Sequence, residues 1–529
     1  MKNIHRTLVL GCSLVALAGC GADEIVSPGT GGPIIIKNPP APAPTSSPAP
    51  GGGTVTAAEQ CPPINSTGGL NNQGVLAGTP TGDYLICRLP ETFDVDDVLP
   101  FEEGLLYEIS NRVNVGTDQG FSSTNTDVTL TIEPGVILFG EGESFFVVNR
   151  GNTIESNGTA TMPIVWTSRE NIEGDVTDSS QAQWGGVVLL GRARVSDCST
   201  LVFNTTPGDF TTNDQCEQQL EGTVVATPFG GADDADSSGS FTFNQIRFSG
   251  FELQQSNELQ SLTTGGVGSG TTIENVFSFN SSDDGLEFFG GQFNARNIAV
   301  IGASDDSLDV DSGARVNLET VVVAQRTDTG DSLIEFDSPD DLADGTPGNA
   351  LPQSELQVNN FTFVQRSSSS SQIVRARGGA ALALSNGVLD TDANGSGICF
   401  RIDEQPTLDA LIGIDSVVGD CDATTFARGD RSGNADETTD AEVQTAINAA
   451  GTNNDFAFTI TLTSTFVNGA NENGVTAFDA TALSSFFAAS TFIGAEDDDL
   501  ADNFGDWTCN SSIVDFGSAT GACTSLPVY

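Results

Sequence analysis

The sequence predicts an all-β protein whose chain winds into a parallel β-helix with coils of about 22 residues. This prediction rests on a repeat of that length, on strand-like alternation within each repeat, and on 60 glycines with few long helical patterns. Periods of about 20 to 25 residues are typical of leucine-rich repeats and of parallel β-helices. The leucine-rich frame L-x-x-L-x-L-x-x-N is absent, whereas the alternation of inward and outward residues indicates strands.

The repeat is clearest between residues 281 and 323. Asp283 and Asp284 precede a short apolar run, and Asp305 and Asp306 repeat this arrangement one coil later. Successive turns of a parallel coil lie about 4.8 Å apart, so residues with this offset should lie above one another. The offset also relates Leu286 to Leu308, Glu287 to Asp309, Phe288 to Val310, Gly291 to Gly313 and Val300 to Val322.

A second signature places apolar residues at positions x, x+3 and x+5. Its middle positions recur at intervals of one coil or longer, and the longest interval lies between Val321 and Phe361. We therefore expect loops to be inserted in the longer intervals. The copies are Phe243/Ile246/Phe248, a weaker Ile273/Val276/Ser278, Ala295/Ile298/Val300, Leu318/Val321/Val323, Val358/Phe361/Phe363 and Leu384/Gly387/Leu389.

Both ends of such a stack need caps, because a single coil cannot bury its apolar face alone. Leu105, Tyr107 and Ile109 alternate as the expected first strand, and Thr439 with Glu442 forms a capping box that predicts a short helix in the C-terminal section. The chain is therefore divided into a signal peptide (1–19), a tether rich in Pro, Gly and Ser (20–60), an N-terminal cap with the first coil (61–126), the parallel β-helix (127–430) and an irregular C-terminal cap section (431–529).

The segment that ends at Cys20 has the pattern of an export signal. A positively charged start precedes an apolar run over 8–17, which is too short to span a bilayer. The letters LAGC that end at Cys20 resemble the lipobox of bacterial lipoproteins, which implies cleavage before Cys20 and lipidation of that cysteine. Gly21 follows in place of an aspartate, so the resemblance implies an anchor in the outer membrane.

Eight cysteines remain after Cys20, and their even number in an exported chain indicates disulfide bonds. No CxxC metal motif is present. Spacing alone does not derive the connectivity, but pairs that are close in sequence would each close a short loop. The expected pairs are Cys61 with Cys87, Cys198 with Cys216, Cys399 with Cys421 and Cys509 with Cys523.

The charged residues exclude several classes of function. The formal net charge is −52, from 71 acids and 19 bases, so nucleic acid is a poor partner. The only histidine, His5, lies in the signal, and Lys37 in the tether is the only lysine that follows the signal. Ser-His-Asp catalysis, histidine-ligated metals, phosphate-loop nucleotide binding and lysine Schiff bases are thereby excluded. The chemistries that remain use carboxylates, arginines, hydroxyls and hard cations.

Stacked acids in adjacent coils predict a cation site. Two like charges about 5 Å apart repel by roughly 1 kcal/mol in water and by several-fold more near a protein surface. Carboxylates with backbone carbonyls suit Ca²⁺, whereas the alternative is that the acids accept hydrogen bonds from turn amides. The expected calcium ligands are Asp283, Asp284, Glu287, Asp305, Asp306, Asp309 and Asp311.

Four phrases carry a resemblance to a known family: VTLTIEPGVILFG (128–140), FFVVNRGNTIESNGTATMPIVWTSRE (145–170), WGGVVLLG (184–191) and SDDGLEFFGG (282–291). They resemble the right-handed parallel β-helix, pectate-lyase-like superfamily, and within it Gram-negative surface lipoproteins that share the WGG and DDG-EFFGG phrases. The resemblance implies a right-handed coil. It is less specific for activity, because the superfamily includes lyases, hydrolases, adhesins and inert scaffolds.

Catalytic candidates follow from the same resemblance. A pectate-lyase-like mechanism would join Ca²⁺ to an arginine base, for which Arg296 and Arg315 are the candidates, although no lysine is available to hold an acidic sugar. A hydrolase would use a pair of acids, for which Asp284 and Asp306 from adjacent coils are the candidates. The arginines in or beside the coils are otherwise expected to neutralise carboxylates; these are Arg296, Arg315, Arg326, Arg366, Arg375 and Arg377.

Together these patterns predict a lipid-anchored outer-membrane protein that binds a glycan, a nutrient or an envelope protein such as an outer-membrane transporter. Display at the cell surface is the expected orientation, and the periplasmic face is the alternative. The alternative class is a polysaccharide lyase or hydrolase that depends on calcium or on carboxylates. A third possibility is a structural or adhesive protein that assembles with copies of itself.

Overall fold

The computed structural model describes residues 54–122, 127–197, 216–223, 225–254, 257–338, 351–391, 395–429, 437–497, 503–517 and 519–529. The expected signal peptide, Cys20, most of the expected tether and Cys198 lie outside these residues. Within them, strands dominate and helices are short, as the all-β prediction requires. No helix in this described part of the chain is both long enough and apolar enough to cross a bilayer.

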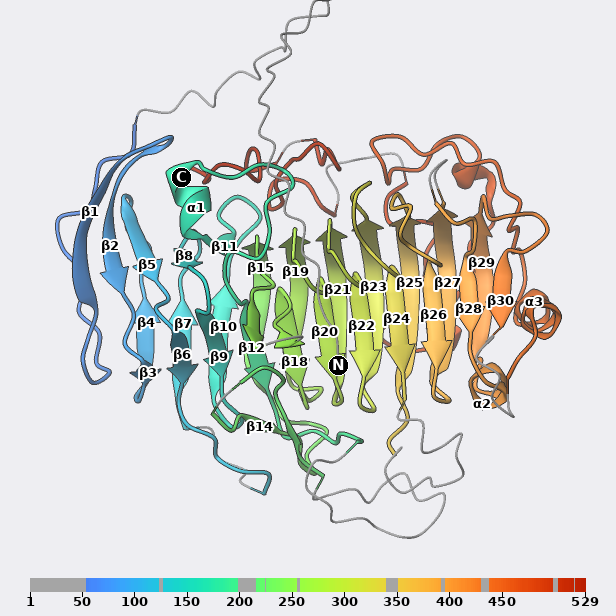
Figure 1. Cartoon of the computed structure of the whole chain (residues 1–529), viewed down its shortest axis with the longest axis horizontal. Coiled ribbons are helices and arrows are strands. Elements are labelled where there is room, and N and C mark those ends of the chain that lie inside the picture. Colours follow the sequence, from blue (N-terminus) through green and yellow to red (C-terminus); the bar gives the residue numbers. More distant parts are fainter. Residues whose placement is uncertain are drawn as a thin grey trace, which may run out of the picture. The chain divides into compact units, whose positions relative to one another are not determined.

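Two long sheets form the walls of the coil (Figure 1). Sheet A has 15 strands and sheet B has 11, and successive coils add parallel strands to both. The strands of sheet A are β1 (Asn71–Thr79), β2 (Gly82–Arg88), β4 (Asp97–Leu99), β5 (Leu105–Glu108), β7 (Thr129–Ile132), β8 (Ile137–Gly140), β10 (Thr153–Asn157), β11 (Ile164–Ser168), β15 (Gly239–Arg247), β19 (Thr272–Phe279), β21 (Gln292–Ile301), β23 (Arg315–Ala324), β25 (Glu355–Val364), β27 (Ala381–Asp390) and β29 (Gly413–Gly419).

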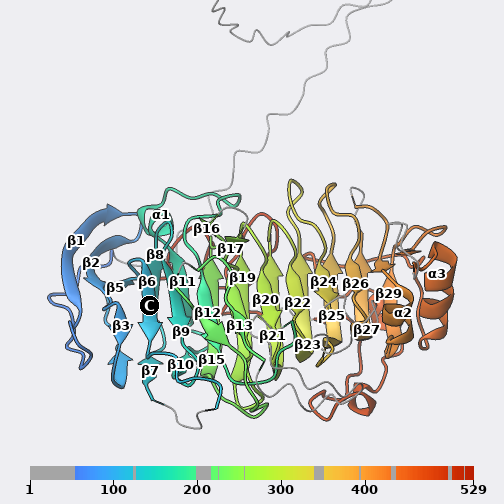
Figure 2. The same cartoon turned by 60° about the horizontal axis from the view of Figure 1, so that its bottom comes forward.

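Sheet B lies beside sheet A along the whole stack, as Figure 2 shows from a second side. Its strands are β3 (Thr92–Phe93), β6 (Arg112–Val115), β9 (Phe145–Val148), β12 (Val187–Leu190), β18 (Leu262–Gly265), β20 (Leu286–Phe289), β22 (Leu308–Asp311), β24 (Ile334–Asp337), β26 (Val374–Arg377), β28 (Phe400–Ile402) and β30 (Ala427–Gly429). Two short hairpins stand apart from both sheets: β13 (Gln218–Gln219) with β14 (Pro228–Phe229), and β16 (Glu252–Gln254) with β17 (Asn257–Glu258).

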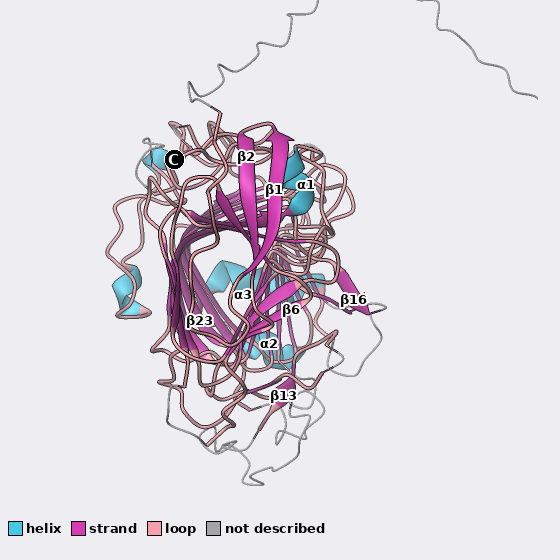
Figure 3. Ribbon diagram, turned by 90° about the vertical axis from the view of Figure 1, so that its left-hand side faces the viewer, coloured by secondary structure: helices cyan, strands magenta, loops and turns pink. Residues whose placement is uncertain are grey.

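The inward side chains of all coils form one continuous apolar core. Leu286 of β20 lies beside Leu308 of β22, and Leu308 lies beside Ile334 of β24. This register confirms the predicted repeat. Figure 3 shows the stack of coils along its axis, with the strands forming the walls. Each coil buries the inward apolar side chains of the neighbouring coils, so the stack is stabilised as a whole.

A left-handed backbone residue explains the x, x+3, x+5 signature. Position x+2 has positive φ in successive coils, for example 56° at Asn297 and 52° at Asn360. The bend at this residue resets the alternation, so Ala295 and Ile298 face the core while Ala299 faces outward. Asparagine tolerates this conformation better than most residues that have a side chain beyond Cβ.

The first copy of the signature was predicted in the wrong register. The register pairs Phe241 of β15 with Ile273 of β19 and Asn244 with Val276, so the stacked triplet begins at Phe241 and not at Phe243. A buried polar residue, Asn244, replaces the expected apolar one and accepts a 2.9 Å hydrogen bond from Nε1 of Trp166. An apolar pattern could not reveal a buried asparagine that is satisfied by a tryptophan.

The N-terminal end begins earlier than the expected first strand. β5 pairs in parallel with β2, and β2 pairs with β1 as an antiparallel hairpin. Val55, from the range expected to be tether, is buried and forms a bridge with Gly82. The hairpin therefore covers the open edge of sheet A.

The helices are short and lie outside the sheets. α1 (Arg169–Glu173) follows β11, whereas α2 (Gln405–Asp409) and α3 (Asp440–Ala449) belong to the last coils. The predicted capping box is present: Oγ1 of Thr439 accepts from the N–H of Glu442, and the Glu442 carboxylate accepts from the N–H of Thr439. This box fixes the start of α3.

After α3 the chain turns back along the outside of sheet A. We call residues 456–529 the return segment; it is orange to red in Figure 1 and includes the 3₁₀ turns η2 (Glu472–Gly474) and η3 (Ala480–Ala482). Its Phe466, Phe504 and Trp507 pack on the outward apolar residues of sheet A, which include Phe277 and Ala299. The sequence predicted a C-terminal cap section but gave no sign that this section runs back over the coils.

Polar contacts fix the return segment in place. Arg247 of β15 is fully buried and donates to the carbonyl oxygens of Cys523 (3.0 Å) and Ser525 (2.9 Å). Burial lowers the pKa of this guanidinium to about 10. The Tyr529 hydroxyl donates to the carbonyl oxygen of Pro163 at 2.8 Å. The last residues of the chain are thus held against early coils.

Three of the expected disulfides are present, joining Cys61 to Cys87, Cys399 to Cys421 and Cys509 to Cys523. Cys216 is also disulfide-bonded, and its expected partner Cys198 lies outside the described residues.

Candidate functional site

The outward face of sheet B carries acids on three successive strands. In β20, β22 and β24 the residue after the inward leucine or isoleucine points outward, as strand alternation requires. Glu287 therefore lies beside Asp309, and Asp309 lies beside Glu335. We call the following set the acidic ladder: Asp283, Asp284, Glu287, Asp305, Asp306, Asp309, Asp311, Asp331, Glu335 and Asp337.

The turns that precede these strands are linked from coil to coil. Oδ1 of Asp284 accepts a 2.9 Å hydrogen bond from the N–H of Asp306, and Oδ1 of Asp306 accepts a 2.6 Å bond from the N–H of Ser332. Oδ2 of Asp283 accepts from the Gln260 amide at 3.1 Å. Turn-amide bonding, the alternative to a cation, therefore occurs at Asp284 and Asp306, and it leaves other oxygens of these carboxylates open.

Three groups within the ladder have the spacing that a shared cation needs. In each group one carboxylate oxygen per residue lies within 4.8 Å of the others. Oxygens that bind one Ca²⁺ at about 2.4 Å cannot be more than about 4.8 Å apart, so the spacing fits. The groups are Asp283/Asp284/Asp305, Asp284/Glu287/Asp309 and Asp305/Asp306/Asp331.

Burial and mutual repulsion raise the pKa values along the ladder. Burial, followed by the charge of Asp305, raises the pKa of Asp283 to about 6, and burial with Glu335 raises that of Asp306 to about 9. For Asp284, Glu287 and Asp309 the same two causes raise the pKa well above the ordinary carboxyl value. Without a cation these groups therefore ionise less readily than ordinary carboxyl groups.

The middle group contains an unsatisfied acceptor. Glu287 is only 6% exposed, and its Oε2 has no hydrogen-bond partner among the described residues. A buried carboxylate oxygen without a donor costs free energy unless a proton or a cation occupies it. The donor set of Asp284, Glu287 and Asp309 therefore fits a hard divalent cation.

Arginines neutralise the next part of the same face. Arg375 of β26 pairs with Glu335 at 3.0 Å, and Arg377 pairs with Asp337 at 2.8 Å. Burial together with Asp311 nevertheless raises the pKa of Asp337 to about 10. The acids near Glu287 form no ion pair of this kind within the described part of the chain. The acids without an arginine partner are therefore concentrated at β20 and β22, within the described residues.

Two predicted candidates lie away from this face. Arg296 belongs to sheet A, where it pairs with Glu319 (3.4 Å) and stacks on Phe486 with 4.4 Å between the guanidinium carbon and the ring centre. Arg315 starts β23 in the same sheet and pairs with Asp234 at 3.1 Å. The structure therefore brings Asp284 and Asp306 together but attaches both arginines to other partners.

Sequence reasoning missed the third coil of the ladder. Asp331, Glu335 and Asp337 lie one coil after Asp305, Asp309 and Asp311, as the register of β22 and β24 shows. The alternation I-E-F-D after L-D-V-D was a usable signal. The offset of one 22-residue coil does not reveal this third set of acids, because an insertion makes the coil that contains them longer than the one before it.

The fold and this site define a class of protein: a parallel β-helix with an acidic, cation-compatible face on one sheet. The family described as "Pectate-lyase like beta helix domain" matches residues 110–467. This match covers more than half of the chain, so the chain belongs to that family. No match was found among curated proteins or among solved structures.

Proposed function

We propose that this protein is a calcium-binding β-helix that acts as a binding scaffold at the bacterial surface. The observation that carries the proposal is the group of buried Asp284 and Glu287 with half-buried Asp309, which has an acceptor without a donor among the described residues. Calcium suits this group better than magnesium, because calcium accepts six to eight oxygens in flexible geometry. A bound ion would offset the repulsion between these acids and fix the spacing of the two coils that contain β20 and β22.

The export signal, the sequence around Cys20 and the tether support a position on the outer membrane. A long regular face then suits capture of a glycan or nutrient, or docking on an envelope protein. The ion would also supply a positive charge on a face that otherwise repels anions.

Removal of two ligands should abolish calcium binding. We expect calorimetric titration of chelator-treated protein to show tight calcium binding that is lost in the Glu287→Gln/Asp309→Asn variant. The amides keep the size of the side chains and remove the charge that binds the ion. Glu143→Gln is the matched control, because Glu143 is an exposed acid outside the ladder. Equal calcium binding by the double variant, or none by the unmodified protein, would refute the metal site.

A polysaccharide lyase or hydrolase is the second candidate. The observation that favours it is Asp306, whose pKa of about 9 keeps its carboxyl protonated at neutral pH beside other acids. A protonated carboxyl of this kind is what a general acid requires.

If the protein is an enzyme of this kind, a panel of polysaccharides should include one that is cleaved, and Asp306→Asn should reduce cleavage by about a hundredfold or more. Asp284→Asn should reduce it as well. Absence of cleavage across the panel by calcium-loaded protein would count against this candidate and leave the binding role in place.

A further inference from the structure

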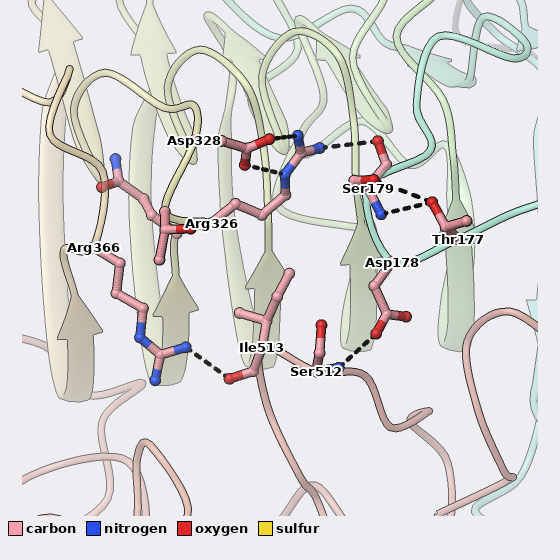
Figure 4. Close-up of a pocket in the computed structure, with 10 residues that line it drawn as sticks. Thr177, Asp178, Ser179, Arg326, Asp328, Arg366, Ser512 and Ile513 are labelled. Atoms are coloured by element: carbon pink, nitrogen blue, oxygen red, sulfur yellow. Dashed lines mark hydrogen bonds and ion pairs between the residues drawn. The ribbon is translucent and has the colours of Figure 1, made fainter. Parts of the chain in front are cut away.

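A polar pocket lies between the coil loops and the return segment (Figure 4), and none of the residues that line it belongs to the acidic ladder. Its volume is about 500 Å³. Its walls come from the loop after α1, from the turns that follow β23 and β25, and from the return segment. The lining residues are Thr177, Asp178, Ser179, Gln325, Arg326, Thr327, Asp328, Arg366, Ser512 and Ile513.

The pocket is held open by bonds between its walls. Oδ2 of Asp178 accepts a 2.7 Å hydrogen bond from the N–H of Ser512, which ties the loop after α1 to the return segment. Arg326 is buried and donates from two nitrogens to the Asp328 carboxylate at 2.9 and 2.8 Å. Its third nitrogen donates to Oε1 of Gln181 at 2.6 Å. The charge of Arg326 is therefore neutralised by Asp328.

Arg366 is different. Its two terminal nitrogens donate to the carbonyl oxygen of Ile513 (2.8 Å) and to Oγ1 of Thr465 (3.0 Å), both of which are neutral acceptors. Among the described residues it forms no ion pair with a carboxylate. Elsewhere on the coils the expected neutralisation occurs, as Arg375 and Arg377 show. A guanidinium has more N–H donors than these two acceptors use, so Arg366 retains both charge and donors.

We propose that this pocket binds a small organic ligand through a carboxylate group, with Arg366 as the residue that holds the anion. The planar guanidinium matches a carboxylate by paired, charge-assisted hydrogen bonds. The volume lies within the range of small-ligand pockets, about 300 to 1,000 Å³. The exposed Thr327 and Ser512 at the rim offer hydroxyl groups to the polar remainder of the ligand.

The large negative charge of the protein does not prevent this binding. Charges more than about 8 Å away are largely screened at physiological salt, so the nearest groups decide the local potential. Near the pocket, Asp328 is neutralised by Arg326, and Asp178 is engaged with the return segment. The pocket shares no residue with the proposed calcium site. It would bind anions, which the acidic ladder cannot do.

The test is calorimetric titration of the calcium-loaded full chain with D-glucuronate, D-glucose and sulfate as probes. We expect D-glucuronate to bind, with D-glucose and sulfate much weaker. Arg366→Gln should weaken binding by about tenfold or more, because it removes the charge-assisted bonds. Thr327→Trp should do the same by filling the pocket while leaving the bonds of Arg366 intact.

Arg169→Gln is the control, because Arg169 lies on α1 and pairs with Glu173 outside the pocket. Its affinity should equal that of the unmodified protein. The proposal is overturned if D-glucuronate does not bind, if both pocket variants keep full affinity, or if sulfate binds as tightly as D-glucuronate.

Discussion

Metal-free protein should lose stability as the pH rises from about 4 to about 9, and calcium should restore it. In the unfolded chain the ladder carboxyls titrate near 4. In the folded state the pKa is raised to about 6 at Asp283 and about 9 at Asp306. Between those limits the folded state binds more protons than the unfolded state, so the free energy of unfolding falls as pH rises.

The effect should be large, because each unit of pKa difference corresponds to about 1.4 kcal/mol and several groups contribute. Thermal unfolding at pH 5, 7 and 8.5, with chelator and with calcium, would measure it. The chelated protein should have its highest melting temperature at pH 5, and calcium should raise the melting temperature most at pH 8.5. A bound cation replaces the protons that the ladder otherwise retains.

The Glu287→Gln/Asp309→Asn variant separates this effect from the overall charge of the chain. It should show a flatter pH dependence and a small response to calcium, whereas Glu143→Gln should behave like the unmodified protein. A melting temperature of chelated protein that rises from pH 5 to pH 8.5 would contradict the prediction.

Deletion of residues 503–529 should leave a protein that self-associates. This part of the return segment contributes Phe504, Trp507 and Phe516 to the cluster that covers Phe277 and Phe279 of β19. Loss of one large buried aromatic side chain typically costs about 3 to 5 kcal/mol, and the deletion removes several. It also exposes a continuous apolar strip, which favours association.

Sedimentation velocity and binding of a hydrophobic dye would detect the change. The matched control is Trp507→Phe, which keeps an aromatic ring and the carbonyl that accepts from Gln245 at 2.6 Å. That variant should stay monomeric with a modest decrease in melting temperature. A truncated protein that remains monomeric and binds no dye would show that sheet A does not need this cover.

The coils could be predicted from sequence because the physics of the repeat is local. Leu286 and Leu308 recur at the offset of one coil, and an apolar side chain at each inward position is the condition for burial. The x, x+3, x+5 pattern was also readable, although its cause was not. The positive φ of Asn297, which causes the pattern, cannot be predicted from the positions of apolar residues.

Other parts could not be read because they depend on distant partners. Asn244 is acceptable in the core because partners that include Trp166 satisfy its amide. Arg247 likewise depends on distant carbonyl oxygens, those of Cys523 and Ser525. Neither pairing has a signature in the sequence. In the acidic ladder, the sequence predicted which acids lie beside one another where two adjacent coils have the same length. It did not do so for Glu335, because an insertion precedes that residue.

The contact between Tyr529 and Pro163 joins residues separated by 366 positions, and it has a consequence for the order of folding. Synthesis proceeds from the N-terminus, so early coils form while the final residues are still missing. Until Phe504, Trp507 and Phe516 emerge, the outward apolar residues of β19 lack this part of their cover. The nascent protein is thus prone to aggregate until the return segment has been made, and closure between residues so far apart in sequence is expected to be slow.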